Sequence, residues 1–155
     1  MLAEAVLSTV AQHVPHEGDA VLLSSVWAEG ELRTLGRAKV AADTPFTDAA
    51  GGWPVWLLIE LMAQVVAAGA GIREFRPGVR PRLGLLLGVR DFRCTLPHLA
   101  TGTELLVEAL EGMRDESGMG VFDCTVAVGS GQVASAILSV YLPDDVAAYL
   151  ESLEP

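Results

Sequence analysis

A chain of 155 residues with 51% hydrophobic side chains can bury a core and is too apolar to stay disordered, so we expect one domain over residues 1–155. The formal net charge of −10 argues against nucleic acid as a general partner, because phosphate binding needs a basic surface. Cys94 and Cys124 lie thirty residues apart with no CxxC motif and no histidine at metal-ligand spacing, so neither a disulfide framework nor a metal site is expected.

The predicted elements begin with a short helical pattern at residues 2–12. This segment lacks the basic start and the cleavage site of a signal peptide, so the protein is expected to be cytoplasmic. Strand-like runs follow at residues 21–27 and 32–42, on either side of a turn at 28–30. A loop rich in Asp, Thr, Pro and Gly, residues 43–52, then leads into the most apolar part of the chain.

That apolar part is residues 53–72, WPVWLLIELMAQVVAAGAGI, with a single carboxylate, Glu60, near its centre. Pro54 fits the first turn of a helix. In a helix, Trp56, Glu60 and Gln64 form one stripe because they are spaced four residues apart. Burial would raise the pKa of Glu60 and suit it to proton transfer. The alternative is that this stripe is the solvent-exposed face of a half-buried helix and has no catalytic role.

The same twenty residues are also long enough for a membrane span. A carboxylate near the middle opposes insertion, since a charge at that depth costs about 2.5 to 3.5 kcal/mol. Gln64 and the glycine-rich end oppose it as well. We therefore expect a buried helix.

Six of the ten basic residues fall in one window of twenty-one residues that starts directly after the predicted helix: Arg73, Arg76, Arg80, Arg82, Arg90 and Arg93. A basic patch on an acidic protein can attract an acidic partner. The alternative is a solubilising loop between apolar elements.

Four further strand-like runs, separated by Gly and Pro at hairpin intervals, are expected at residues 83–95, 103–111, 119–128 and 132–142. Asp144 is expected to cap a last helix at residues 145–153. One long apolar helix with two strands before it and four after it predicts an α+β fold, an antiparallel sheet wrapped around one central helix. The edges of such a sheet favour a dimer.

Four segments carry a resemblance to a known family: VPHEGDAVLLSSV at 14–26, WPVWLLIELMAQ at 53–64, GLLLGVRDFRCTLPHLATGTELLV at 84–107 and SVYLPDD at 139–145. In this order they resemble the hotdog-fold β-hydroxyacyl-acyl-carrier-protein dehydratases, and more closely the ApeP-like branch of the aryl-polyene pathway. The resemblance covers nearly the whole chain. It implies a hotdog fold and the dehydration of 3-hydroxyacyl thioesters to trans-2-enoyl thioesters, in fatty-acid-like or polyene biosynthesis. It also implies a substrate carried on the phosphopantetheine of an acyl carrier protein and no other cofactor.

The same resemblance implies that His16 and Glu60 form the catalytic pair. Neutral His16 would act as the base and protonated Glu60 as the acid. Backbone N–H groups near Val55 and Trp56 would hold the charge that develops on the thioester oxygen. Gln64 is expected beside the substrate, on the same stripe as Glu60.

The chain departs from the family pattern in two places. The general dehydratases carry a histidine shortly before the helix, and the loop at residues 44–54 has none, so the role of that histidine passes to His16 or is missing. The resemblance to the aryl-polyene branch, which also lacks the upstream histidine and keeps the Pro-His, favours His16. Val55 stands where the family usually has glycine, and its β-carbon is expected to crowd the thioester. His13 and His98 are expected to be structural.

Two alternatives remain open. In a hotdog thioesterase, Glu60 would activate water and His16 would be dispensable. In a non-catalytic hotdog subunit, the chain would bind acyl groups or support a partner dehydratase. The expected partners are an acyl carrier protein, docked by Arg73, Arg76, Arg80 and Arg82, and a second hotdog chain in a homodimer or a heterodimer.

Overall fold

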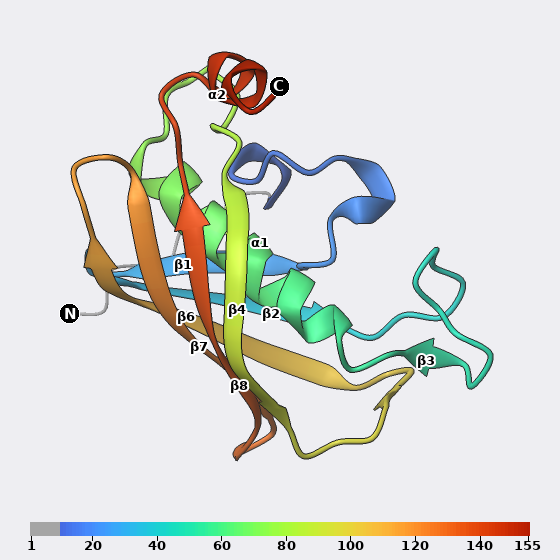
Figure 1. Cartoon of the computed structure of the whole chain (residues 1–155). Helices are drawn as coiled ribbons and strands as arrows, with labels where there is room; N and C mark the ends of the chain where they lie inside the picture. Colours follow the sequence, from blue (N-terminus) through green and yellow to red (C-terminus); the bar gives the residue numbers. More distant parts are fainter. Residues whose placement is uncertain (1–9) are drawn as a thin grey trace.

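Six strands of the computed structural model form one antiparallel sheet in the order β1-β2-β6-β7-β8-β4. The structure describes residues 10–155, so most of the helix predicted at residues 2–12 lies outside the described residues. The strands are β1 (Ser25–Glu29), β2 (Arg33–Lys39), β4 (Leu85–Cys94), β6 (Glu104–Arg114), β7 (Met119–Val128) and β8 (Gly131–Tyr141). Figure 1 shows this sheet curving around the central helix α1 (Leu57–Arg73), as the sequence predicted.

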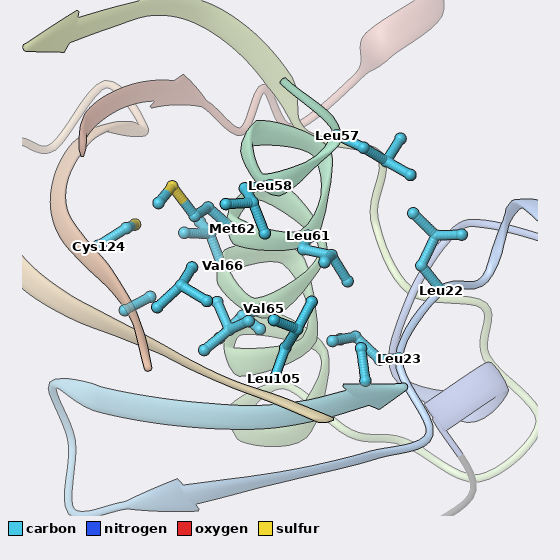
Figure 2. Packing of buried hydrophobic residues seen from close by; sticks show 14 of the residues in the cluster. Leu22, Leu23, Leu57, Leu58, Leu61, Met62, Val65, Val66, Leu105 and Cys124 are labelled. Atoms are coloured by element: carbon cyan, nitrogen blue, oxygen red, sulfur yellow. The ribbon is translucent and has the colours of Figure 1, made fainter. Parts of the chain in front are cut away.

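The core lies between α1 and the concave face of the sheet. The buried side of the helix carries its large apolar residues, Leu57, Leu58, Leu61, Met62, Val65 and Val66. Figure 2 shows Val65 on the side of Leu105 of β6, Met62 on the side of Cys124 of β7, and Leu57 on the side of Leu22; all belong to one buried cluster. Full burial of a side chain of this size contributes about 1.5 to 3 kcal/mol, so the helix is held mainly by its apolar face. None of the helices within residues 10–155 is long and apolar enough to cross a membrane.

The helix begins at Leu57, four residues later than the sequence predicted. Its expected first residues are used differently, because β3 (Gly52–Trp53) pairs with β5 (Leu99–Ala100) in a small second sheet. The side chain of Trp53 is buried, and its indole N–H donates to Thr44 Oγ1 at 3.2 Å. This long-range pairing has no periodic signal in the sequence.

Two other boundaries were wrong by a few residues. The first hairpin turns at residues 30–32 instead of 28–30, and Gly30 there has a φ of +66°, which favours glycine. The last helix, α2 (Val146–Ser152), is capped by Asp145 and not by Asp144. The carboxylate of Asp145 accepts from the Ala148 N–H at 3.0 Å.

Candidate active site

His16 and Glu60 come from distant parts of the chain and meet with His16 Nε2 and Glu60 Oε1 3.1 Å apart. Glu60 projects from the first turn of α1. His16 lies between two short 3₁₀ helices, η1 (Val10–Gln12) and η2 (Gly18–Ala20). This segment packs closely on α1 because Gly71 has no side chain: a β-carbon there would lie 2.1 Å from the carbonyl oxygen of His13.

Gln64 lies behind Glu60, fully buried, and does not line the cavity beside the pair. Its amide nitrogen donates to Glu60 Oε1 at 2.9 Å and to the Ala20 carbonyl at 2.6 Å. Its amide oxygen accepts from the Leu22 N–H at 3.0 Å. Gln64 therefore positions the carboxylate and also ties the segment that follows His16 to the helix, whereas the sequence placed it beside the substrate.

The pKa of Glu60 is lowered from its ordinary value, although the sequence predicted a raised one. Burial is the largest single effect and acts to raise the pKa. The hydrogen bonds from His16 and Gln64, with the charge of His16, together outweigh it. The side chain of Glu60 is still 39% exposed, which limits the effect of burial. The resting chain therefore favours an ionised Glu60.

A cavity of about 400 Å³ opens beside the pair. His16 and Glu60 lie on its wall, and one face of α1 forms its floor with Ala63, Val66, Ala67 and Ala70. The opposite wall comes from the sheet, with Leu86 of β4, Phe122 of β7 and Val140 of β8. Charged residues line the part of the cavity near the β6–β7 turn: Arg82, Arg114, Asp115, Glu116 and Asp144.

The two residues expected to hold the thioester oxygen precede the helix and do not line this cavity. Trp56 is 60% exposed, and Val55 is half-buried. The backbone N–H groups of both residues have no acceptor among the described residues, whereas the next three N–H groups bond to carbonyls of Pro54, Val55 and Trp56. Glu60 is about 6 Å further along the helix axis, at 1.5 Å per residue from Trp56. Free donors are thus present one turn before the carboxylate.

The arginines of the expected docking patch are not equivalent. Arg73 donates to Thr34 Oγ1 at 3.0 Å and to the Arg33 carbonyl at 2.9 Å. Burial lowers the pKa of the Arg73 guanidinium. Since these contacts join the end of α1 to β2 and the first hairpin, Arg73 has a structural position and not a docking one.

The other three arginines lie on the loop after α1 or at its end. Arg82 pairs with Glu74 at 2.7 Å, and this bond raises the pKa of Arg82. Arg80 pairs with Glu17, the residue that follows His16. Arg76 is exposed and has no ion-pair partner among the described residues. Arg80 therefore contacts the residue next to His16, and Arg76 is exposed on the same loop.

His98 forms a second histidine–carboxylate pair, which the sequence did not indicate. Its Nε2 lies 2.8 Å from Asp48 Oδ2. Asp48 also accepts from the Ala50 N–H at 3.0 Å, and this pair does not line the cavity. It joins the loop before the helix to the chain just before β5, so His98 is structural. His13 is buried against Phe75, with neither ring nitrogen bonded among the described residues.

Comparison with known proteins places the chain in a family. The ApeP-like family, described as ApeP dehydratase, matches residues 8–151. A chain of the dehydratase heterocomplex ApeI:P from Xenorhabdus doucetiae is 26% identical, with a TM-score of 0.84, over 95% of this chain and 99% of that chain. A comparison with curated proteins found no match.

Two more distant structures share the fold alone. Cj0977, a sigma28-regulated virulence protein from Campylobacter jejuni, is 12% identical with a TM-score of 0.66, over 92% of this chain and 97% of that chain. The E. coli PaaI protein is 14% identical with a TM-score of 0.57, over 75% and 80%. The family match spans nearly the whole chain, and the sheet wraps the helix as the resemblance implied. The chain therefore has the hotdog fold and belongs to the ApeP-like dehydratase family.

Proposed function

We propose that this chain removes water from 3-hydroxyacyl thioesters on an acyl carrier protein and forms trans-2-enoyl thioesters. The observation that supports this most directly is the 3.1 Å contact between His16 Nε2 and Glu60 Oε1 on the wall of a cavity. Dehydration needs one group that accepts the α-proton and another that protonates the departing hydroxide. A paired imidazole and carboxylate that share one proton meet both needs.

In the proposed cycle the pair holds one proton in all, and Glu60 begins as the carboxylate because its pKa is lowered. Arrival of an apolar acyl group removes water from Glu60 and strengthens the effect of burial, which raises its pKa. The proton then moves across the 3.1 Å contact to Glu60. Neutral His16 takes the α-proton, the carbon–oxygen bond breaks, and Glu60 protonates the hydroxide, which leaves as water. His16 is protonated again at the end, so the pair returns to its resting form.

The thioester oxygen gains negative charge when the α-proton leaves. We propose that the free N–H groups of Val55 and Trp56 stabilise that charge at the start of α1. The side chain of Val55 then lies next to the thioester and narrows the space for it. The proposed reaction uses only proton transfers and backbone N–H groups and therefore needs no further cofactor. The substrate is proposed to arrive on the phosphopantetheine of its carrier.

Two partners follow from the same proposal. The acidic carrier protein is proposed to dock at Arg76 and Arg80, because Arg80 pairs with Glu17 directly beside His16. A second hotdog chain, identical or related, is proposed to pair with β4. The similar chain from Xenorhabdus doucetiae belongs to a heterocomplex, ApeI:P, and β4 lies at the edge of the present sheet.

The test is to incubate the protein with 3-hydroxyacyl carrier protein, alone and with candidate partner chains, and to look by mass spectrometry for the loss of one water. His16→Ala and Glu60→Gln should each lower kcat by about 10²-fold or more, because each removes a proton-transfer group. The double variant should be little worse than the worse single variant, since both groups act in one transition state.

His98→Ala is the matched control, because it breaks a histidine–carboxylate pair away from the cavity. It should keep the wild-type rate. Release of free carrier thiol by a His16→Ala variant, with Glu60→Gln inactive, would indicate a thioesterase instead. Wild-type rates for both variants in a working complex would mean that this subunit is not the catalytic one.

A further inference from the structure

Beyond Glu60, the face of α1 that lines the cavity carries three alanines and one valine, Val66. Ala63, Ala67 and Ala70 recur at intervals of three or four residues and are half-buried, whereas Leu58, Leu61, Met62 and Val65 are fully buried on the other side of the helix. All three alanines line the cavity that begins at the His16–Glu60 pair. Glu60 and Ala70 are separated by about 15 Å along the helix at 1.5 Å per residue. The cavity is therefore a groove along the helix, and it starts at the pair.

The wall opposite the helix is apolar, and a glycine in it leaves space for an aromatic ring. Phe122 of β7 lines the groove next to Gly120, two residues earlier on the same face of the strand. A β-carbon at Gly120 would lie 2.9 Å from the ring of Phe122. Glycine thus leaves room for the ring beside its own strand, and a larger residue would displace the ring. Leu86 and Val140 complete this wall without polar atoms on their side chains.

The end of the groove away from the pair carries charge, but its cations are already paired. Arg82 bonds to Glu74 and Asp144, and Arg114 bonds to Glu111 at 3.0 Å. Three carboxylates line this end against these two guanidinium groups: Asp115, Glu116 and Asp144. An anionic group would be repelled by the surplus of negative charge there, whereas an uncharged chain would not be repelled.

We infer that this groove holds the acyl chain of the substrate and selects a long, unbranched and uncharged chain, about as long as an extended dodecanoyl group. The inference rests on the proposed function, because the pair would act on the carbons next to the thioester and the rest of the chain would follow the alanines. Dehydration at the pair and chain binding along the helix are separate properties of one cavity, and each has its own measurement.

The test is a ladder of substitutions along the groove: Ala63→Leu, Ala67→Leu and Ala70→Leu. Binding of butyryl, octanoyl and dodecanoyl pantetheine amides to the full chain, within its complex if a partner is needed, is measured by calorimetry. In the wild-type protein each added methylene should tighten binding by about fourfold until the groove is filled. Ala63→Leu should abolish the gain in affinity for chains longer than butyryl. Ala70→Leu should lower the affinity for the dodecanoyl amide only.

Ala147→Leu is the matched control, since Ala147 is exposed on α2 and does not line the groove. It should leave the chain-length profile unchanged. A dodecanedioyl amide, which ends in a carboxylate, should bind wild type more weakly than the dodecanoyl amide. Phe122→Leu should raise an affinity where the alanine-to-leucine variants lower one. The smaller wall residue leaves space for a branch, so a methyl-branched chain should bind more tightly.

Equal affinity for all chain lengths in the wild-type protein would overturn the inference, and so would losses that do not depend on the position of the leucine. Loss of complex formation in the ladder variants, with an unchanged chain-length profile, would mean that a partner chain fills the groove. These amides bind without reacting, so a chain that fails the dehydration assay still gives a result. Dehydration of a 3-hydroxybutyryl substrate, together with equal affinity for all chain lengths, would keep the proposed function and reject the groove.

Discussion

Glu60 shares one oxygen between two donors and keeps the other free. Its Oε1 lies 3.1 Å from His16 Nε2 and accepts from Gln64 at 2.9 Å, while Oε2 has no partner among the described residues. A free carboxyl oxygen next to a paired one can reach a substrate hydroxyl without breaking the contact with His16. Gln64 keeps this arrangement, because its amide also bonds to two backbone groups.

The pH dependence of stability should reflect the lowered pKa of Glu60. The unfolded chain binds this proton near the ordinary pKa of 4.5, and the folded chain binds it only at lower pH. Ionised Glu60 thus contributes stability above that pH, and the contribution is lost as the pH falls through the folded pKa. The difference in unfolding free energy between wild type and Glu60→Gln should be largest at neutral pH and should shrink below about 4.5.

Urea unfolding at a series of pH values measures this difference. Glu154→Gln, an exposed glutamate near the end of the chain, is the control and should show no such dependence. A difference that grows in acid would contradict the assignment of an ionised Glu60.

Gln64→Glu should show whether Gln64 acts through Glu60. The new carboxylate keeps the shape but cannot donate to Glu60, and the two neighbouring charges would raise one pKa of the pair. We expect the pH profile of kcat to move to higher pH, with KM little changed. The lost bond to the Ala20 carbonyl should also cost about 1 to 3 kcal/mol of stability. Gln132→Glu, at an exposed position on β8, is the control and should change neither the pH profile of kcat nor the stability.

At the scale of elements, the loop that follows α1 brings basic residues to the same side as His16. Arg80 bonds to Glu17, and Arg82 bonds to Glu74 and lines the groove. Arg73, by contrast, is fastened to the first hairpin. A cluster that looks uniform in the sequence is divided by the fold into one structural residue and a few that can meet a partner.

If the proposed docking of a carrier protein is correct, charge reversal in this loop should act mainly on association. The double variant Arg76→Glu and Arg80→Glu should raise KM for a carrier-bound substrate and weaken its salt dependence, because it removes attraction for an acidic partner. A short pantetheine thioester should be little affected. Lys39→Glu, an exposed basic residue on β2, is the control. Equal losses for both substrates would show that the arginines only support the fold.

At the scale of the whole molecule, β4 lies at one end of the sheet, and its outer edge has no partner strand among residues 10–155. It pairs with β8 on one side only and has two register shifts along its length. Leu86 and Leu87 are exposed on this strand. A long strand edge with exposed leucines is a surface on which a second sheet can add. This surface lies close to the groove, since Leu86 lines it.

The protein should therefore not persist as a single chain. Light scattering should give a mass above 16.3 kDa, either alone or with a related hotdog chain. Leu87→Glu should weaken the complex, because it adds charge to the exposed edge. Met113→Glu is the matched control: Met113 is also apolar and exposed, but it lies on β6, an inner strand of the sheet. A stable species of 16.3 kDa at micromolar concentration would contradict this assignment.

Local patterns in the sequence were enough to predict the main helix, the six long strands and their order along the chain. The apolar spacing around Glu60 predicted α1, and β7 was predicted with its observed bounds. The resemblance added the pairing of His16 with Glu60 as an expectation. Periodicity works for these features because each element must bury its own apolar face, and that requirement repeats within a few residues.

Only the tertiary structure decided what lies beside each residue. The β3–β5 pair, the burial of Gln64 behind Glu60 and the separation of Arg73 from its neighbours all depend on contacts between distant segments. The direction of the Glu60 pKa was wrong for the same reason, since the sequence shows a carboxylate in an apolar helix but not the two donors that meet it. Hydrogen bonds and charges act over a few ångströms in space, and distance along the chain does not report them.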